Sequence, residues 1–104
     1  MAADSMTFAD LHIDVAPHCT AHRVKTLAVF GSFARGNATR DSDLDLLVEF
    51  LGEDHLFDRF TALQSELQAV AGRSVDLLTE NSLRNPVFRR TVAREKLPVW
   101  TSAA

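Results

Sequence analysis

The sequence has only one cysteine, three prolines and four glycines in 104 residues, and it contains no long uninterrupted apolar run. A single cysteine, Cys19, cannot close an intramolecular disulfide or form a thiolate metal cluster, so both kinds of cross-link are excluded. We expect Cys19 to be a small buried side chain in a reducing compartment. The missing apolar run argues against a secretory signal or a transmembrane span, so we expect a cytoplasmic protein without membrane contact.

The charge balance and composition are those of an ordinary folded domain. The formal net charge is -3 at pH 7, which gives no general attraction to nucleic-acid phosphates, so direct nucleic-acid binding is disfavoured. With 46% hydrophobic and 24% charged residues, the chain is not of the disordered class. We therefore predict a single domain over residues 1–104, with its core in about residues 24–100.

Apolar spacing and turn residues predict an alternation of helices and strands. A mixed apolar pattern favours a short helix within residues 7–18, which Pro17 is expected to end. The other expected elements are a strand at 26–30 stopped by Gly31, a short helix at 32–37, a turn-rich loop at 37–42 and a strand at 43–50.

The second half continues the alternation. Asp54 is expected to cap a helix that ends at Gly72, with one apolar face formed by Leu56, Phe57, Phe60, Leu63, Leu67 and Val70. A strand at 74–79, a helix capped by Asn85 with Pro86 at its first position, and an edge strand at 97–100 follow. In the last helix Val87, Phe88 and Val92 are expected to face the core. This order predicts an α/β fold with a mixed sheet of three to four strands packed against helices.

The turn Gly31-Ser32 follows the first predicted strand and has the chemistry of a phosphate-binding loop. Glycine permits a tight turn and close approach of a ligand, and the N–H groups that open the next helix attract anions. Ser32 adds a hydroxyl donor, although such turns are common and serine is also a good helix cap. The guanidinium of Arg35 suits phosphate oxygens, or it pairs with Asp41 or Glu49.

Asp43 and Asp45 are the most informative pair. Residues two apart on a strand point to the same face with Cα atoms roughly 6.6 Å apart, so the two carboxylates can converge. Carboxylates held together repel, and a hard divalent cation between them explains best why both stay ionised. Mg²⁺ prefers oxygen ligands and shares its sphere with substrate phosphates. A solvated edge strand is the alternative, and the apolar neighbours Leu44, Leu46 and Leu47 argue against it.

Asp76 lies in another predicted strand, where alternation places it on the face opposite Val75 and Leu77. If this strand lies beside the one that carries Asp43 and Asp45, three carboxylates meet and can hold two metal ions. Asp76 is then a metal ligand or the base for an acceptor hydroxyl. Alone, it is more simply an exposed aspartate at a sheet edge.

These residues resemble the minimal nucleotidyltransferase family of the DNA polymerase beta superfamily, in which Gly-Ser is followed after ten residues by Asp-x-Asp. Residues 33–42 are that gap here, and the resemblance extends over about residues 26–100. It implies that the turn Gly31-Ser32 binds the triphosphate of ATP, and because Arg35 lies within the family motif we expect it to bind the nucleotide too. It also implies that Asp43, Asp45 and Asp76 are the catalytic residues and the ligands of two Mg²⁺ ions.

The resemblance further implies transfer of a nucleoside monophosphate, AMP from ATP, to a hydroxyl with release of pyrophosphate. Short members of the family are antitoxins that adenylylate and neutralise a HEPN ribonuclease toxin, so we expect a type VII-like antitoxin with a HEPN toxin as its partner. Two alternatives stay open. One is a non-catalytic antitoxin that acts by binding, and the other is an antibiotic-type enzyme that modifies a small molecule.

The remaining features have ordinary explanations beside their functional ones. The basic residues of the last helix suit an acidic partner or RNA, but a solvated helix face explains them better. Phe57, Phe60 and Phe88 suit an adenine pocket, although aromatic residues at helical spacing more often fill a core. The four histidines are assigned no role.

Overall fold

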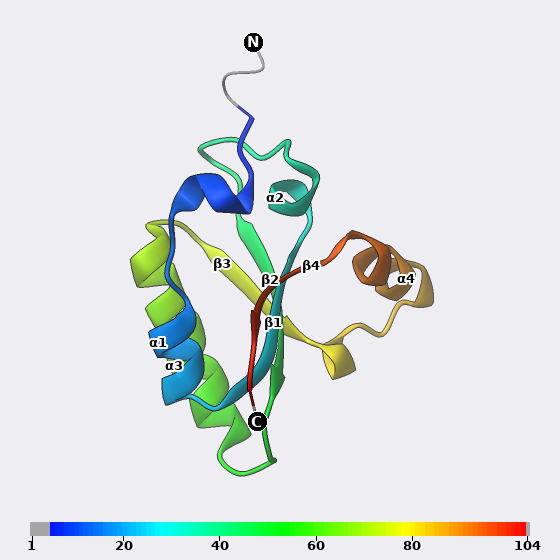
Figure 1. The fold of residues 1–104 in the computed structure, drawn as a ribbon. Helices are drawn as coiled ribbons and strands as arrows, with labels where there is room; N and C mark the ends of the chain where they lie inside the picture. The colour runs from blue at the N-terminus through cyan, green and yellow to red at the C-terminus, as the bar shows by residue number, and fades with distance from the viewer. Residues whose placement is uncertain (1–4, 104) are drawn as a thin grey trace.

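The computed structural model describes residues 5–103, so residues 1–4 and 104 of the predicted domain lie outside the described part. Its helices are α1 (Ala16–Ala21), α2 (Ser32–Arg35), α3 (Leu56–Ala71) and α4 (Pro86–Glu95), with 3-10 helices η2 (Phe8–Leu11) and η3 (Glu80–Ser82). Its strands are β1 (Val24–Phe30), β2 (Leu44–Phe50), β3 (Val75–Thr79) and β4 (Leu97–Thr101). They form one sheet in the order β3-β2-β1-β4 (Figure 1). The predicted mixed α/β sheet is confirmed.

The sheet mixes both kinds of pairing. β1 is antiparallel to both β2 and β4, and β4 lies at the edge, as predicted. β2 and β3 are parallel, with Leu44 opposite Val75 and Asp45 opposite Asp76. Parallel neighbours need a crossover connection, which α3 provides. The register of this parallel pair sets the positions of the acidic side chains.

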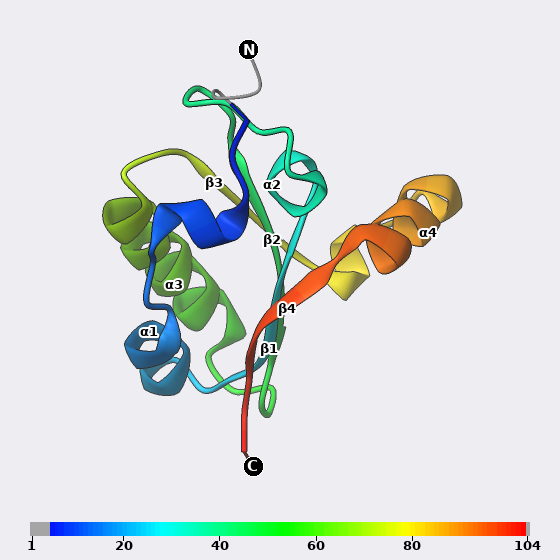
Figure 2. The ribbon, with the colours of Figure 1, turned by 45° about the horizontal axis from the view of Figure 1, so that its top comes forward.

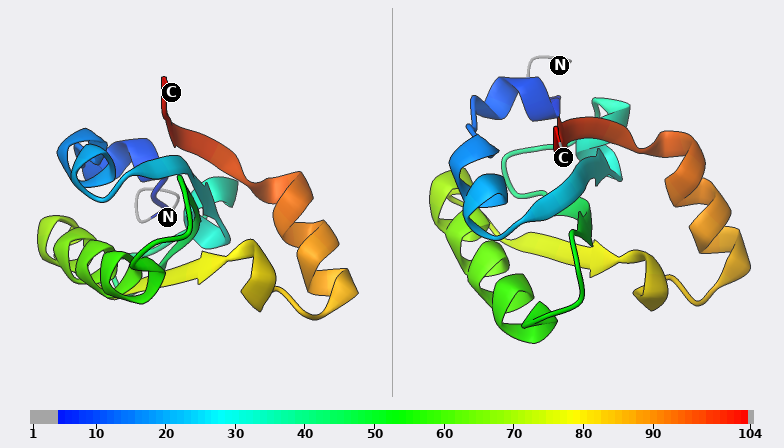
Figure 3. Two further views of the ribbon diagram at one scale, coloured as in Figure 1. Left: turned by 90° about the horizontal axis from the view of Figure 1, so that it is seen from below. Right: turned by 60° about the horizontal axis from the view of Figure 1, so that its bottom comes forward.

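The two faces of the sheet are covered differently. Helices α1 and α3 lie against one face, and α4 lies on the other side (Figures 1 and 3). Leu44, Leu46 and Val48 of β2 join the larger core on the α1 and α3 side. Leu47 packs with Phe30, Leu83 and Val92 in a smaller core near α4. Because side chains alternate along a strand, Asp45 lies on the α4 side.

The prediction that Pro17 ends a helix is wrong. The segment forms two short helices, η2 and α1, and Pro17 lies in the first turn of α1. Proline lacks a backbone N–H, and a helix start is where that N–H is not needed. The carboxylate of Asp14 accepts a hydrogen bond from the N–H of Ala16 at 3.1 Å and supports this start. Cys19 of α1 is fully buried, and burial raises the pKa of its thiol to about 12.

The start of α3 also differs from the prediction. His55, in a left-handed conformation with φ 53°, occupies the N-cap position, and Asp54 is bound to Arg23 at 2.6 Å instead. Leu63 and Leu67 are buried and Phe60 packs against the core, as expected. Leu56, Phe57 and Val70 are exposed, so the apolar face is narrower than the spacing suggested.

The cap of α4 is confirmed, because Asn85 accepts hydrogen bonds from the N–H groups of Val87 and Phe88. Of the three core residues predicted in α4, only Val92 is buried. Val87 and Phe88 are exposed. Among residues 5–103, no helix has both the length and the apolar character that a membrane span requires.

Arg59 is the buried charged residue that joins α3 to the ends of two strands. Only 7% of it is exposed, and its guanidinium lies 4.8 Å from the centre of the Phe50 ring. It donates at 2.7 to 3.0 Å to the backbone carbonyls of His22, Arg23, Leu51 and Asp54. These carbonyls belong to irregular backbone, so Arg59 provides the partners that a sheet or helix would otherwise supply.

We predict that Arg59→Leu lowers the free energy of unfolding by about 3 kcal/mol or more, because it removes four hydrogen bonds from a buried charged donor to partly buried backbone carbonyls. Urea denaturation measures the change. The control is Arg90→Leu, which removes an exposed arginine of α4. This variant should change the free energy of unfolding by less than about 0.5 kcal/mol. Equal stability of the two variants would contradict a structural role for Arg59.

Candidate active site

The turn after β1 brings backbone close to a carboxylate. Gly31 has φ 71°, which favours glycine, and a Cβ at this position would overlap Oδ2 of Asp45. Ser32 opens α2 directly after it (Figure 2). The N–H groups of Ala34 and Arg35 donate to the carbonyl of Gly31 at 3.1 Å and close the turn. Glycine is therefore required both by the backbone angle and by the neighbouring side chain.

Asp45 and Asp76 are register partners on adjacent parallel strands. Asp45 is partly buried, whereas Asp43 and Asp76 are exposed. Burial raises the pKa of Asp45 from its ordinary 3.8 to about 6, with further contributions from the charges of Asp76 and then Asp43. The nearby Arg35 acts in the opposite direction. The prediction that the strand of Asp76 lies beside that of Asp43 and Asp45 is confirmed.

A cleft of about 500 Å³ joins the turn to the acids. All six residues predicted for the site line it: Gly31, Ser32, Arg35, Asp43, Asp45 and Asp76. Phe30, Ser42, Leu78, Phe88, Thr91 and Glu95 complete the lining. Residues from β1, β2, β3 and two helices therefore meet in one cavity.

Arg35 does not pair with Asp41 or Glu49, the two partners considered from the sequence. Its Nη1 donates to Oε2 of Glu95 at 2.8 Å, which links the turn to the last turn of α4. Glu95 is 60 positions away in the sequence, and no local pattern indicated the contact. Arg35 is about half exposed, so its other N–H groups are open to an anion from solvent.

Arg73 fixes the loop between the two halves of the motif. Its Nη1 donates to the carbonyls of Thr39, Arg40 and Ser42 at 3.2 to 3.3 Å, and its guanidinium lies 5.0 Å from the centre of the Phe33 ring. It thereby holds residues 39–42 in place directly before Asp43. The sequence offered no signal for this residue, because its contacts are more than 30 positions away.

The donor set fits Mg²⁺. Within residues 5–103, no three His, Cys, Asp or Glu side chains stand ready as a metal cage. Mg²⁺ does not need one, because it takes one or two carboxylates and completes its sphere with water and phosphate oxygens. A cation would also offset the repulsion by Asp76 and Asp43, which adds to the effect of burial on the pKa of Asp45.

Two histidines have partners that sequence reasoning missed. Nδ1 of His18 and Nε2 of His22 each lie 2.7 Å from a carboxylate oxygen of Glu66, and both contacts lower the pKa of that carboxyl. The spacing of four residues between His18 in α1 and His22 at its C-cap indicated that both lie on one side of the helix, but it did not indicate Glu66 as their partner. The cluster ties α1 to α3 on the side of the sheet away from the cleft.

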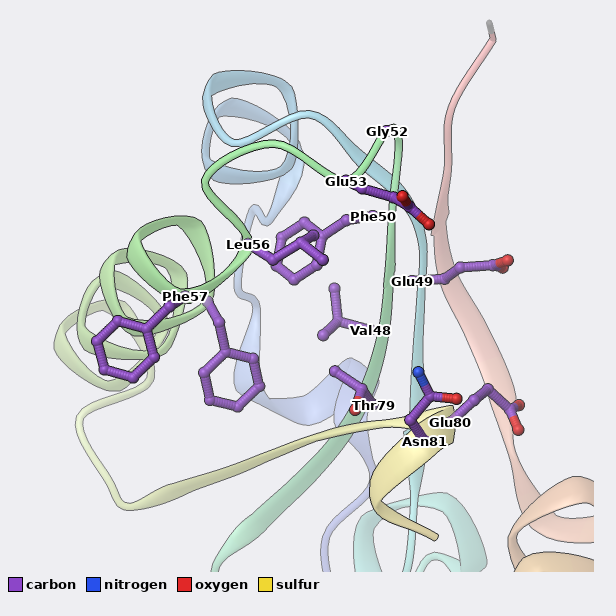
Figure 4. Close-up of a pocket in the computed structure, with 11 residues that line it drawn as sticks. Val48, Glu49, Phe50, Gly52, Glu53, Leu56, Phe57, Thr79, Glu80 and Asn81 are labelled. Atoms are coloured by element: carbon purple, nitrogen blue, oxygen red, sulfur yellow. The ribbon is translucent and has the colours of Figure 1, made fainter.

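A second cavity, of about 580 Å³, contains none of the predicted site residues. Figure 4 shows its lining, with Val48 and Phe50 from the end of β2 and Leu56 and Phe57 from the start of α3. Phe60 also lines it. Two of the three phenylalanines considered for an adenine pocket therefore lie here, and the third, Phe88, lies in the cleft with the acids.

The model of the nucleotidyltransferase domain family matches residues 18–99, which include the whole cleft motif. The chain belongs to this family. Protein adenylyltransferase MntA of Thermococcus cleftensis is 42% identical over 72 residues, which are 69% of this chain and 71% of that protein.

Solved structures agree with this assignment. A protein assigned as a minimal nucleotidyltransferase is 38% identical, with a TM-score of 0.66 over 85% of this chain and 98% of that one. A toxin–antitoxin structure with AMP-PNP matches with a TM-score of 0.66 at 21% identity, over 86% of this chain and 72% of that one. A third structure is the tri-AMPylated HEPN toxin of Shewanella oneidensis in complex with the MNT antitoxin. It matches with a TM-score of 0.52 at 16% identity, over 85% of this chain and 67% of that one. The last two similarities establish the fold.

The raised pKa of Asp45 predicts a pH-dependent cost in stability. The Asp45 carboxyl binds its proton more tightly in the folded protein than in the unfolded chain. The free energy of unfolding therefore falls as the pH rises from 3.8 to about 6. Asp45→Asn removes that loss. At neutral pH and without divalent cations it should stabilise the protein by about 1 kcal/mol, a figure reduced because solvent screens a partly exposed group.

Thermal melts with a chelator present, recorded from acid to neutral pH, measure this effect as a rise in Tm of about 4–8 °C for Asp45→Asn at neutral pH. Glu53→Gln removes one negative charge from an exposed loop and is the matched control. If both variants followed the same pH profile as the original protein, the cost would not arise at Asp45.

Proposed function

We propose that this protein is a Mg²⁺-dependent adenylyltransferase that transfers AMP from ATP to a hydroxyl of a HEPN-type toxin, and that it acts as the antitoxin of the pair. The observation that carries the proposal is the single cleft in which the Gly31-Ser32 turn meets Asp43, Asp45 and Asp76. Family membership supports nucleotidyl transfer. The name of the Thermococcus relative and the AMPylated toxin in a structural neighbour support a protein acceptor.

The carboxylates provide the metal-binding part of the site. Asp43, Asp45 and Asp76 would hold one or two Mg²⁺ ions, which supply positive charge to the triphosphate and lower the pKa of an acceptor hydroxyl. Asp45 must be ionised to do this. The neighbouring charges that raise its pKa in the free protein make binding of the cation favourable.

The Gly31-Ser32 turn provides the phosphate-binding part. The missing side chain at Gly31 lets a phosphate lie close to the backbone, and the hydroxyl of Ser32 can donate to its oxygens. Arg35 lines the same cleft, and the guanidinium N–H groups that Glu95 does not use can donate to a phosphate oxygen. These contacts hold the triphosphate beside the three acids.

The acceptor can approach from solvent, because Asp43 and Asp76 are exposed at the cleft. In the proposed reaction the acceptor oxygen bonds to the α-phosphorus, the bond from that phosphorus to the β-phosphate oxygen breaks, and pyrophosphate leaves. Asp76 accepts the proton of the hydroxyl. Asp76 is the register partner of Asp45, so its carboxylate lies close to where the attacked phosphate would bind, as a general base must.

Labelled ATP tests the activity directly. Together with Mg²⁺ and a cognate HEPN toxin, the purified protein should give a labelled toxin. Asp43→Asn with Asp45→Asn should lower the rate at least about 100-fold, because removal of a single electrostatic contact to a transition state has that effect. A matched double variant, Asp41→Asn with Glu53→Gln, removes two exposed charges that do not line the cleft and should keep its activity.

The same variants separate catalysis from binding alone. If the Asp43 and Asp45 double variant binds the toxin but no longer neutralises it, chemistry is responsible. Full neutralisation by this variant, or no label from the unaltered protein while a positive control is labelled, would reject the enzymatic proposal.

A further inference from the structure

The lining of the cleft has two chemically different parts. One part is polar and carries the turn and the acids, namely Gly31, Ser32, Asp43, Asp45 and Asp76. The other part is apolar and consists of Phe30, Leu78 and Phe88, which lie on β1, β3 and α4. A nucleoside triphosphate has the same division, with charged phosphates at one end and an apolar base face at the other. A volume of about 500 Å³ lies in the range of small-molecule sites.

Phe88 is the most exposed residue of this apolar part, because Leu78 is only partly exposed. Phe30 is buried, whereas 43% of Phe88 is exposed. The two rings meet edge to face, with their centroids 6.1 Å apart and an angle of 71° between their planes. The N–H of Phe88 also donates to the cap Asn85. The ring is therefore held in place while much of its surface stays free.

The polar side chains that α4 places in the cleft are already engaged. The hydroxyl of Thr91 donates to the carbonyl of Val87 at 3.0 Å. Glu95 accepts from Arg35. Discrimination between bases by hydrogen bonds requires polar groups available to their edges, and this helix offers neither side chain for that purpose.

Phe57 and Phe60 do not compete for this role. They line the cavity of Figure 4, on the α3 side of the sheet, which contains none of the acidic site residues. A single nucleotide whose phosphates lie at Gly31 cannot reach across the sheet to them. Phe88 is thus the exposed aromatic residue that shares a cavity with the phosphate-binding turn.

We propose that Phe88 stacks on the base of the bound nucleotide, an inference that rests on the proposed nucleotidyltransferase function. Stacking on an aromatic ring tolerates every base and grows with the area of contact. The site therefore prefers purine over pyrimidine nucleotides and separates ATP from GTP weakly. Phe88 is a binding residue for the base and is not needed for the phosphates.

Calorimetry with two probes tests this inference. Phe88→Ala should weaken binding of Mg²⁺-ATP roughly 5- to 100-fold, the range of a stacking contact, and leave binding of Mg²⁺-tripolyphosphate unchanged. Phe88→Trp should restore ATP binding. Phe57→Ala, which removes an even more exposed phenylalanine from the other cavity, should change neither affinity. The unaltered protein should bind ATP and GTP within about threefold of each other, and both more tightly than CTP.

The outcomes are distinguishable. Unchanged ATP affinity in Phe88→Ala would overturn the stacking role and leave the proposed function standing. Equal weakening of ATP and tripolyphosphate would assign Phe88 a structural role and also overturn it. If the unaltered protein binds neither probe, the proposed function fails and the stacking role fails with it.

Discussion

The parallel pairing of β2 with β3 is the constraint on which the site depends. It places Asp45 directly opposite Asp76, and burial of Asp45 together with the charge of Asp76 raises the pKa of Asp45. A shift of one residue in this register would move Asp76 to the α3 side, because side chains alternate along a strand. Leu44 and Val75 are paired one position earlier on the same two strands, and both are buried on the opposite face of the sheet. Their packing in the larger core therefore fixes the register and with it the position of the acids.

Arginine side chains hold the irregular backbone around this sheet. Arg59 binds four carbonyls near the ends of β1 and β2, and Arg73 binds three carbonyls in the loop that leads to Asp43. Each also lies over a phenylalanine ring, Phe50 and Phe33. A guanidinium has five N–H donors in a fixed plane, so one residue can satisfy several carbonyls that no strand or helix pairs. The loops of a short chain are fixed in this way without a disulfide.

Helix α4 gives the cleft its second wall. Its N-terminal turn presents Phe88 and its last turn presents Glu95, which holds Arg35 of the opposite wall. Val92, on the same helix, is buried in the smaller core and anchors the wall to the sheet. The amphipathic pattern that would normally bury a whole helix face is divided here between Val92 in the smaller core and Phe88 in the cleft. This division explains why Phe88, expected in the core, is exposed, whereas Val87 is exposed and lines neither the core nor the cleft.

Local sequence features determined the elements and the residues of the candidate site. The stop at Gly31, the Asn85-Pro86 helix start and the alternation around Asp45 and Asp76 act over a few positions, so the sequence alone predicted them. The tertiary structure decided the contacts that depend on distant partners. Arg35 with Glu95, Arg73 with the loop at 39–42, and Glu66 with His18 and His22 join segments more than 30 positions apart. Composition and spacing do not encode such pairs, because they arise only after the sheet has brought its strands and helices together.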